Sequence, residues 1–363
     1  MKELEDATPF CKYYGACGGC QLQHWQEAPY REWKRELVVS AFARRGIVAE
    51  VGGLIDAHGS GRRRVSLHVR RSEGHVTAGF MAARSHDLID IDHCPVLVPE
   101  LHEATAIARA IGTRLGDCDV ALTASETGID ASVKAERKIV TRELEKLAPL
   151  VAGLGLARLT VNGEIIATLR TPSVRMGSAS VPLPPVSFLQ ATQRGEEVLA
   201  GLVIEAVGKA KSVGDLFCGL GPFALRLAEG ARVTAFDSDR AAIAALGQAV
   251  RMTRGLKPVT ATVRDLFREP LVAGEIKEFD AVVLDPPRAG AEAQSRQLAK
   301  SKVKTVVMVS CDPMTLARDA EILLRGGYAI RAVTPVDQFK WTSHVETVAV
   351  FHHSSGQRDS PSR

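Results

Sequence analysis

The spacing of hydrophobic and polar positions changes about halfway along the chain of 363 residues. Between about residues 62 and 170, apolar and polar residues alternate in short runs separated by Gly-containing turns, which is typical of antiparallel strands. Helical spacing precedes this region at 31–46 and interrupts the alternation at 97–116. From about residue 194 onward, short apolar runs alternate with helical segments. That order predicts a parallel sheet with helices on both faces.

The chain is therefore expected to hold two domains, as its length also suggests. A Pro-rich passage at 181–188 accompanies the change of pattern, and we place the boundary near residue 175, to within about ten residues. The expected division is a cysteine-rich segment at 1–30, a mixed α+β domain at 31–175, an α/β domain at 176–353 and a polar, disordered tail at 354–363.

Composition narrows the classes of protein that the chain can belong to. Hydrophobic residues make up 45% and charged residues 24%, as in folded globular proteins. Aromatic residues make up only 5%, which argues against aromatic stacking as the main way of binding a partner. The formal net charge of +4 permits an anionic partner without demonstrating one. The chain shows no signal-peptide pattern and no long apolar run, so we expect a cytoplasmic, monomeric protein.

A Gly-rich turn, DLFCGLGPF at 215–223, follows the first strand of the second half. Glycines let a backbone approach a ligand closely at a helix N-terminus. Later strand ends carry Asp237, Asp265 and Asp285, and acids there accept hydrogen bonds from ribose hydroxyls. Only one G-x-G is present, so the dinucleotide fingerprint is incomplete. The row of acids suits a cationic cofactor with a free ribose, S-adenosylmethionine, better than a pyrophosphate. From the glycines alone an unrelated α/β fold stays open, and Cys218 is expected to be a buried filler.

Cys311, in VSCDP, lies at the carboxyl end of a predicted strand and before a helix. The helix end is expected to lower the pKa of its thiol, although a buried structural cysteine is the alternative. A thiolate suits methylation of uracil carbon 5, because its addition to carbon 6 makes carbon 5 nucleophilic. A base must then remove the carbon 5 proton, and Glu346 is the candidate, with an ordinary strand-end glutamate as the alternative. Arg288, after Asp285-Pro286-Pro287, can hold a base carbonyl or a phosphate.

Four motifs, DLFCGLGPF, LDPPRAG, VSCDPMTLARD and HVETVAVF, occur in the order shown by the RNA uracil-5-methyltransferases, which the chain resembles from Cys11 to about Phe351. The resemblance implies a Rossmann-like class I methyltransferase domain preceded by a mixed α+β central domain that helps to hold RNA. It implies Cys311 as the nucleophile and Glu346 as the base. The positions that it implies for the cofactor are Gln190, Phe217, Gly219, Gly221, Pro222, Asp237, Asp265 and Asp285.

The chain departs from the family pattern in places. Phe339-Lys340-Trp341-Thr342 stands where members often have F-P-x-T, and Pro222 stands where a polar residue is common. Both departures concern RNA and cofactor contacts rather than a catalytic group. Many relatives also carry a small N-terminal β-barrel, which we expect this chain to lack.

Four cysteines, Cys11, Cys17, Cys20 and Cys94, are candidates for one metal site. Their number suits either tetrahedral zinc or an iron–sulfur cluster, and spacing alone does not choose between them. The resemblance extends to the iron–sulfur subgroup at all four positions and so implies a [4Fe–4S] cluster of structural role. Cys118 is expected to take no part.

Arg62, Arg63 and Arg64 precede a predicted strand and are candidates for phosphate contacts, with a solvated strand face as the alternative. The expected function is methylation of uridine carbon 5 in structured RNA. Ribosomal RNA, the 23S rRNA in particular, is favoured over transfer RNA because the iron–sulfur subgroup contains the large-subunit enzymes. A non-catalytic RNA-binding iron–sulfur protein is the competing class, and a small-molecule or protein methyltransferase is a third.

Overall fold

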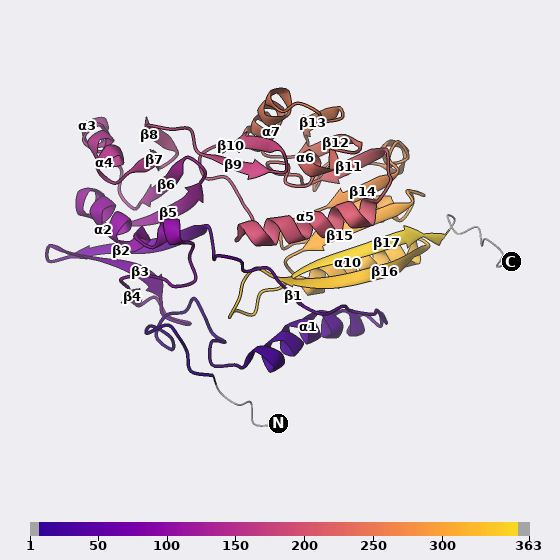
Figure 1. Cartoon of the computed structure of the whole chain (residues 1–363), viewed down its shortest axis with the longest axis horizontal. Helices are drawn as coiled ribbons and strands as arrows, with labels where there is room; N and C mark the ends of the chain where they lie inside the picture. The colour runs from indigo at the N-terminus through magenta and orange to yellow at the C-terminus, as the bar shows by residue number, and fades with distance from the viewer. Residues whose placement is uncertain (1–6, 355–363) are drawn as a thin grey trace.

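The computed structural model describes residues 7–354 and contains two sheets joined by a short hairpin (Figure 1). The larger sheet has eight strands in the order β1 (Ile55–Asp56), β16 (Tyr328–Asp337), β17 (Glu346–His353), β15 (Thr305–Ser310), β14 (Ala281–Leu284), β11 (Ser212–Leu216), β12 (Arg232–Asp237) and β13 (Val259–Val263). Strands β11 to β15 run parallel, and β17 runs antiparallel between β15 and β16. The predicted parallel sheet is thus confirmed for β11 to β15, which form one side of the sheet as far as its edge strand β13.

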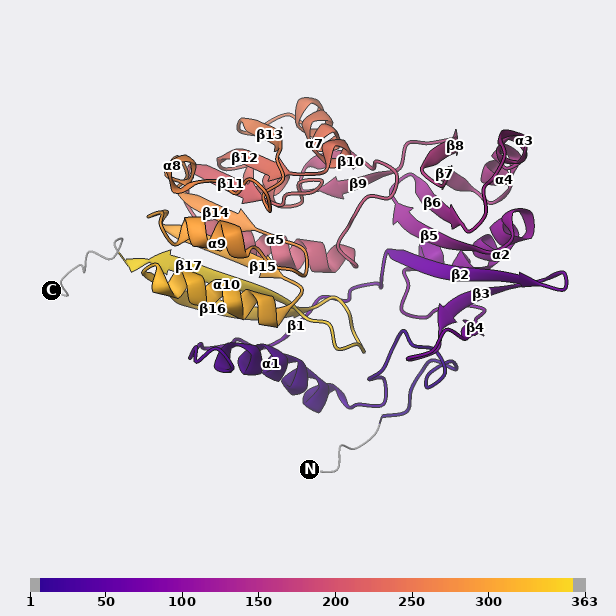
Figure 2. The ribbon, with the colours of Figure 1, turned by 180° about the vertical axis from the view of Figure 1, so that it is seen from behind.

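Helices cover both faces of this sheet (Figure 2). Helices α5 (Gln193–Val207), α6 (Ala224–Leu227) and α7 (Arg240–Met252) pack on one face. Helices α1 (Glu27–Ala43), α8 (Ala273–Ile276), α9 (Glu292–Leu298) and α10 (Pro313–Arg325) pack on the other. Strands buried on both faces need apolar side chains throughout, which is why β14 reads AVVL without a polar position.

The smaller sheet has seven strands in the order β4 (Leu88–Asp90), β3 (His75–Met81), β2 (Arg64–Ser72), β5 (Cys118–Ser125), β6 (Gly128–Ala135), β7 (Leu156–Val161) and β8 (Glu164–Thr168). All neighbours are antiparallel except β6 and β7. Its core lies under α2 (Ala104–Leu115) and α4 (Ala148–Gly153), and the remaining elements are η1 (Pro99–Leu101) and α3 (Thr141–Glu145). The alternating burial along β2 follows from having a single covered face.

The structure divides the chain differently from the expected boundary of the first domain. We expected 31–175 to form one central domain, yet α1 packs on α10 and β1 pairs with β16 of the larger sheet. The hairpin of β9 (Ser173–Met176) and β10 (Ala179–Pro182) packs on α7. An amphipathic helix shows which of its faces is apolar but not which sheet covers that face. The helix also ends at Ala43 rather than 46.

No helix within residues 7–354 is long and apolar enough to cross a membrane. Most of the expected disordered tail, residues 355–363, lies outside the part of the chain that the structure describes.

Candidate active site

The carboxyl ends of the parallel strands bring the predicted catalytic residues to one edge of the larger sheet. Asp285 follows β14 directly and Cys311 follows β15 directly. Strand β17 begins at this edge because it runs the opposite way, and Ser310 pairs with Thr347. The residues next to this pair are Cys311 and Glu346. Two residues that are 35 positions apart in the sequence therefore meet at one strand end.

Glu346 is only 4% exposed, and its Oε1 accepts a hydrogen bond of 3.1 Å from Gln338 Nε2. Burial raises the pKa of this carboxyl to about 7, while the hydrogen bond and the charge of Arg288 oppose the rise. A carboxyl that titrates near neutral pH is well matched to accept a proton from substrate. The interpretation of Glu346 as an ordinary surface glutamate does not fit this burial.

Cys311 is half-buried at the N-terminus of α10. Its thiol does not have the lowered pKa expected from the helix end. Burial, followed by the nearby Glu346 and Asp285, raises the pKa to about 11 against the opposing charge of Arg288. The helix end gives little help because Asp312 already caps it, its carboxylate accepting from the amides of Met314 and Thr315.

Arg288 reaches across the edge of the sheet to the loop before β17. Its Nη2 donates to His344 Nδ1 at 3.0 Å, with both side chains exposed enough to meet a substrate. Burial and the charge of Arg288 lower the pKa of His344, so the imidazole is held neutral and accepts this hydrogen bond. The guanidinium thus stands beside the proposed nucleophile and base, where it can hold a base carbonyl or a phosphate.

The Gly-rich loop after β11 has the backbone that a ligand cradle needs. Phe217, Gly219 and Gly221 all have positive φ, and a Cβ added at Gly221 would lie 2.5 Å from Leu246 Cδ1. The amide of Gly219 donates to Asp237 Oδ2 at 2.8 Å, which joins the loop to the end of β12. Only glycine satisfies both the backbone angle and the contact at position 221.

The remaining predicted cofactor positions surround this loop. Asp265 Oδ1 accepts from the amides of Phe267 and Arg268, and the Phe267 ring packs on Phe217 with centroids 5.3 Å apart. Gln190 Nε2 donates to Asp285 Oδ2 at 3.3 Å, so Gln190 lies at the catalytic end of the loop. Pro222 presents its carbonyl to Arg226.

Two buried polar residues at this edge were missed by sequence reasoning. Asp215, in β11, is fully buried, and neither of its carboxyl oxygens forms a hydrogen bond of good geometry within the described residues, although the nearby amide of Ala224 opposes the rise in its pKa. Burial raises its pKa to about 8, and Asp237 adds to the rise. Gln338, also fully buried, bridges Glu346 to Gln190. Each was visible as a polar residue within or directly after an apolar strand, which is an unusual place unless it has a partner.

An orphaned acid next to a glycine cradle fits a cofactor that carries positive charge and hydroxyl donors. S-adenosylmethionine has both. Residues of this chain that can hold it are Asp215, Asp237, Asp265 and Asp285, together with Gln190 and the loop 217–222.

The four predicted cluster cysteines come together from two distant segments. Cys11, Cys17, Cys20 and Cys94 all line one pocket, together with Arg62 and Gln23. The N-terminal segment is held to β3, where Gly18 N donates to Met81 O at 3.0 Å. As they stand, no three His, Cys, Asp or Glu side chains within residues 7–354 are arranged to hold a metal ion. Cys118 lies apart, buried in the central core.

The three predicted RNA-contacting arginines have three different environments. Arg63 is buried, with Nη2 2.6 Å from Glu196 Oε2 and Nε donating to Gln190 O. Arg62 lines the cysteine pocket and donates to Lys340 O. Arg64 forms no hydrogen bond or ion pair within the described chain, and its guanidinium lies 4.4 Å from the centroid of the exposed Phe188 ring. Arg64 also lines a cavity of about 370 Å³ beside Ser66, Thr123 and Ser187.

Comparison with known proteins agrees with this geometry. The crystal structure of the Pyrococcus abyssi tRNA (uracil-54, C5)-methyltransferase with S-adenosyl-L-homocysteine matches 93% of this chain and 86% of that chain, with a TM-score of 0.72 and 24% identity. The fold is that of a class I methyltransferase. Residues 185–354 match the family model described as tRNA (Uracil-5-)-methyltransferase.

Relatives in sequence extend the match over nearly the whole chain. An RNA methyltransferase of Brucella suis is 49% identical over 95% of this chain and 84% of its own. The 23S rRNA (uracil(1939)-C(5))-methyltransferase RlmD of Halomonas elongata is 34% identical over 97% of this chain and 78% of its own. The chain belongs to the RNA uracil-5-methyltransferase family. It is an RNA methyltransferase whose methyl donor is S-adenosylmethionine.

Proposed function

We propose that this enzyme methylates carbon 5 of a uridine in 23S rRNA through a covalent bond between Cys311 and carbon 6. The observation that carries the proposal is the pairing of Ser310 with Thr347, which sets Cys311 beside Glu346 at the cofactor edge of the sheet. A buried carboxyl with a pKa of about 7 next to a half-exposed thiol is the pair that this chemistry requires.

The reaction follows from the roles of these two side chains. The Cys311 thiolate adds to carbon 6, and the electron pair released toward carbon 5 makes that carbon nucleophilic. S-adenosylmethionine supplies the methyl group. The Glu346 carboxylate then takes the carbon 5 proton, and the carbon–sulfur bond to Cys311 breaks to restore the ring. Arg288 holds the uracil carbonyl or its phosphate during these steps.

Ribosomal RNA is preferred as the substrate because RlmD, named for a 23S rRNA uridine, aligns over nearly the whole chain. Transfer RNA is the second candidate, on the description of the matching family model. Both substrates belong to the cytoplasm. A non-catalytic RNA-binding protein is disfavoured, since it has no need of both a strand-end cysteine and a buried glutamate.

The RNA contact that we propose for the central domain is Arg64. Burial and the neighbouring Arg63 lower the pKa of its guanidinium, and it forms no ion pair within residues 7–354. A cation held without a counter-charge, on the rim of a cavity and over an exposed ring, is suited to a phosphate. Arg63 already has Glu196 as its partner and serves instead to fix Gln190.

We further propose that Cys11, Cys17, Cys20 and Cys94 hold a [4Fe–4S] cluster. All four thiols line one pocket, and the charge of Arg62 opposes the rise in pKa that burial causes at Cys20 and Cys94. A cation beside thiolates suits a cluster that carries net negative charge. The cluster would tie the N-terminal segment to the loop after β4.

The deciding experiment offers 23S rRNA and transfer RNA transcripts to the enzyme with S-adenosylmethionine and maps 5-methyluridine. A parallel assay uses RNA with 5-fluorouridine, whose carbon 5 carries no proton to remove, so that the protein stays bonded to it. We expect an adduct with the wild type and with Cys118→Ala, and none with Cys311→Ala. An adduct of undiminished yield in Cys311→Ala would contradict the mechanism, and methylation of transfer RNA alone would contradict the substrate.

A further inference from the structure

The proposed base depends on the loop of residues 338–345, which joins β16 to β17. Gln338, at the start of this loop, donates both amide protons: to Glu346 Oε1 at 3.1 Å and to Gln190 Oε1 at 2.6 Å. Its Oε1 accepts from the amide of Thr192 at 3.4 Å. Reversing the amide would turn its oxygen toward two acceptors, so the orientation of Gln338 is unique. Glu346 is therefore aimed by a fully buried amide.

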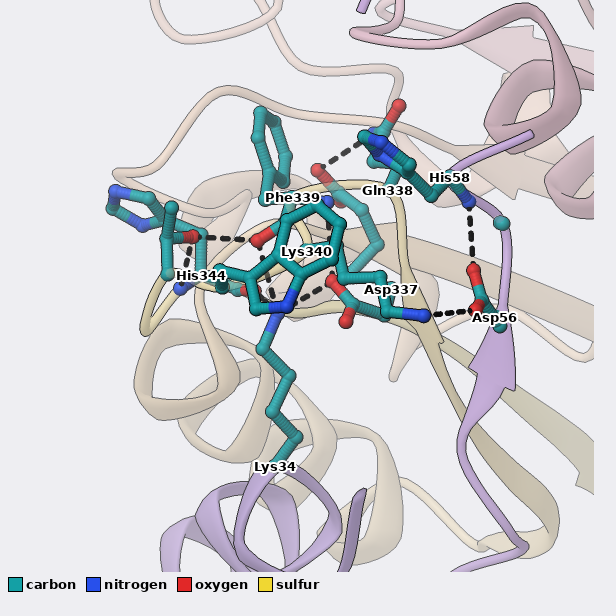
Figure 3. Close-up of polar contacts among 12 residues, drawn as sticks. Lys34, Asp56, His58, Asp337, Gln338, Phe339, Lys340 and His344 are labelled. Atoms are coloured by element: carbon teal, nitrogen blue, oxygen red, sulfur yellow. Dashed lines mark hydrogen bonds and ion pairs between the residues drawn. The ribbon is translucent and has the colours of Figure 1, made fainter. Parts of the chain in front are cut away.

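The loop is anchored by a residue from the far end of the chain. Lys34 of α1 points from its helix toward the loop (Figure 3) and is fully buried. Its ammonium donates to Asp337 Oδ1 at 2.5 Å, to Phe339 O at 3.2 Å and to His344 O at 2.7 Å. The three contacts lie just before the loop, near its start and near its end, and they use all three protons of the ammonium.

A second side chain of α1 completes the anchor. Tyr30 OH donates to Asp337 Oδ2 at 2.6 Å and accepts from the amide of Trp341 at 2.9 Å. Asp337 Oδ1 also accepts from the amide of Phe339 at 3.1 Å. Almost every polar contact of the buried pair is thus made with the loop or with α1. A pair placed only for stability has no need to follow the loop so closely, since apolar side chains of similar volume serve stability at least as well.

We propose that Lys34 and Asp337 form a positioning pair, which holds the loop 338–345 so that Gln338 keeps Glu346 aimed at carbon 5 of the bound uracil. This inference rests on the proposed role of Glu346 as the base. Both side chains are fully buried, so the pair acts through the loop and not by contact with the substrate. It acts on the last proton transfer more than on the attack of Cys311, because Cys311 is carried by β15 and α10 and the loop reaches the attack only through the hydrogen bond between His344 and Arg288.

This assignment makes a specific kinetic prediction. A misaimed base leaves methyl transfer intact but slows removal of the carbon 5 proton, so the methylated RNA stays bonded to Cys311. We expect Lys34→Met and Gln338→Leu to lower turnover about tenfold or more, since small displacements of a catalytic group have effects of this size. The fraction of enzyme bonded to RNA at steady state should rise several-fold over the wild type.

The experiment uses the full chain with S-adenosylmethionine and saturating uridine RNA, quenched in denaturant so that bonded protein can be counted on a gel. Glu346→Gln sets the scale for a missing base. Arg158→Met is the matched control, because Arg158 forms a buried pair with Asp130 in the central domain, with Nη2 2.6 Å from Oδ2. It should lower the melting temperature without raising the bonded fraction.

The double variant Lys34→Met/Asp337→Leu separates positioning from stability. It replaces the pair by apolar groups and removes the uncompensated charge, so the fold should recover while the contacts to Phe339 O and His344 O stay absent. A raised bonded fraction in the folded double variant supports the proposal, and recovery of wild-type turnover overturns it.

Gln338→Leu provides the test if Lys34→Met does not fold. Because Gln338 also holds Gln190 of the cofactor site, this variant is measured at saturating S-adenosylmethionine, and a wild-type bonded fraction there overturns the proposal too. If Glu346→Gln itself leaves no excess of bonded RNA, it is the assignment of Glu346 as the base that fails.

Discussion

Two groups of cysteines in this protein have different neighbours. Burial raises the pKa of Cys311 to about 11, with Glu346 and Asp285 adding to the rise and Arg288 opposing it. The four pocket cysteines are gathered from the N-terminal segment and the loop after β4, beside Arg62. Burial raises the thiol pKa there too, to about 11 for Cys94, although Arg62 opposes the rise. The difference teaches that thiol pKa does not separate the two groups. Their partners do: acids stand beside the single Cys311, for which we propose bond-making, whereas the pocket gathers four thiols, for which we propose a cluster.

The largest effect is expected from removing the acid beside Cys311. Glu346→Gln should lower turnover by roughly 10²–10⁴, as for other lost general bases, while 5-fluorouridine RNA still forms the adduct. Initial rates with uridine RNA measure turnover, and denaturing gels measure the adduct with 5-fluorouridine RNA. An equal loss of both would mean that Glu346 serves the attack of Cys311 and not the proton transfer.

The same acid gives the reaction a characteristic pH dependence. The pKa of Glu346 is raised to about 7, so the carboxylate that accepts the proton is lost as pH falls through 7. Resolution of the bonded intermediate should slow about tenfold per pH unit below 7 and level off above it. Adduct formation should instead keep rising with pH beyond 8, because the pKa of Cys311 is raised to about 11. Rapid-quench measurements of each step from pH 5.5 to 9 check this, and a common profile for both steps would contradict it.

The pocket cysteines are expected to affect stability rather than bond-making. Anaerobically purified protein should be brown and contain about four irons per chain, and Cys94→Ser should lose that iron and melt at a lower temperature. Below its melting point the variant should still form the 5-fluorouridine adduct. Cys118→Ser, at a buried core position outside the pocket, is the control. A colourless, zinc-loaded wild type would contradict the cluster.

A smaller effect is expected at Asp215, a further buried acid at the edge of the sheet that carries Cys311. Burial raises its folded-state pKa to about 8, so the folded state holds a proton that the unfolded state releases near its ordinary value. Stability from this group is present at low pH and is lost as pH rises from about 4 to 8. Asp215→Asn removes that loss, so its free energy of unfolding should exceed that of the wild type by about 1 kcal/mol at pH 5 and by several kcal/mol at pH 8, measured without cofactor. A pH-independent difference would contradict this, and weaker S-adenosylmethionine binding should accompany the gain.

The smallest effect is expected at Arg64, which lines a cavity of the central domain apart from the cysteine pocket. Arg64→Ala should weaken RNA binding several-fold and reduce the slope of log affinity against log salt by about one. Arg251→Ala, at the exposed end of α7, should leave both unchanged. Titrations of labelled RNA at several salt concentrations measure this. An unchanged slope would remove Arg64 from the RNA interface.

The sequence predicted those features of the site that depend on neighbouring residues, but not those that depend on residues distant in the chain. The strand-end position of Cys311 and the glycine cradle could be predicted because each lies within a few residues of its own motif. The raised pKa of Cys311 could not be predicted, because it depends first on burial in the folded chain and then on Glu346 and Asp285 arriving from other strands. From the sequence, Arg63 is a candidate phosphate contact or a residue of a solvated strand face. In the structure it is buried and forms an ion pair with Glu196 of α5.

By itself, then, the sequence determined the class of fold and the order of the motifs, and it supplied the candidates that we propose as reacting groups, since apolar periodicity and short motifs act over a few residues. Only the tertiary structure decided that α1 belongs to the catalytic sheet and that Lys34 is buried against Asp337 rather than solvated. It also decided which arginine stays free of a counter-charge. Those outcomes depend on burial and charge pairing between residues up to about 300 positions apart, which no local pattern records.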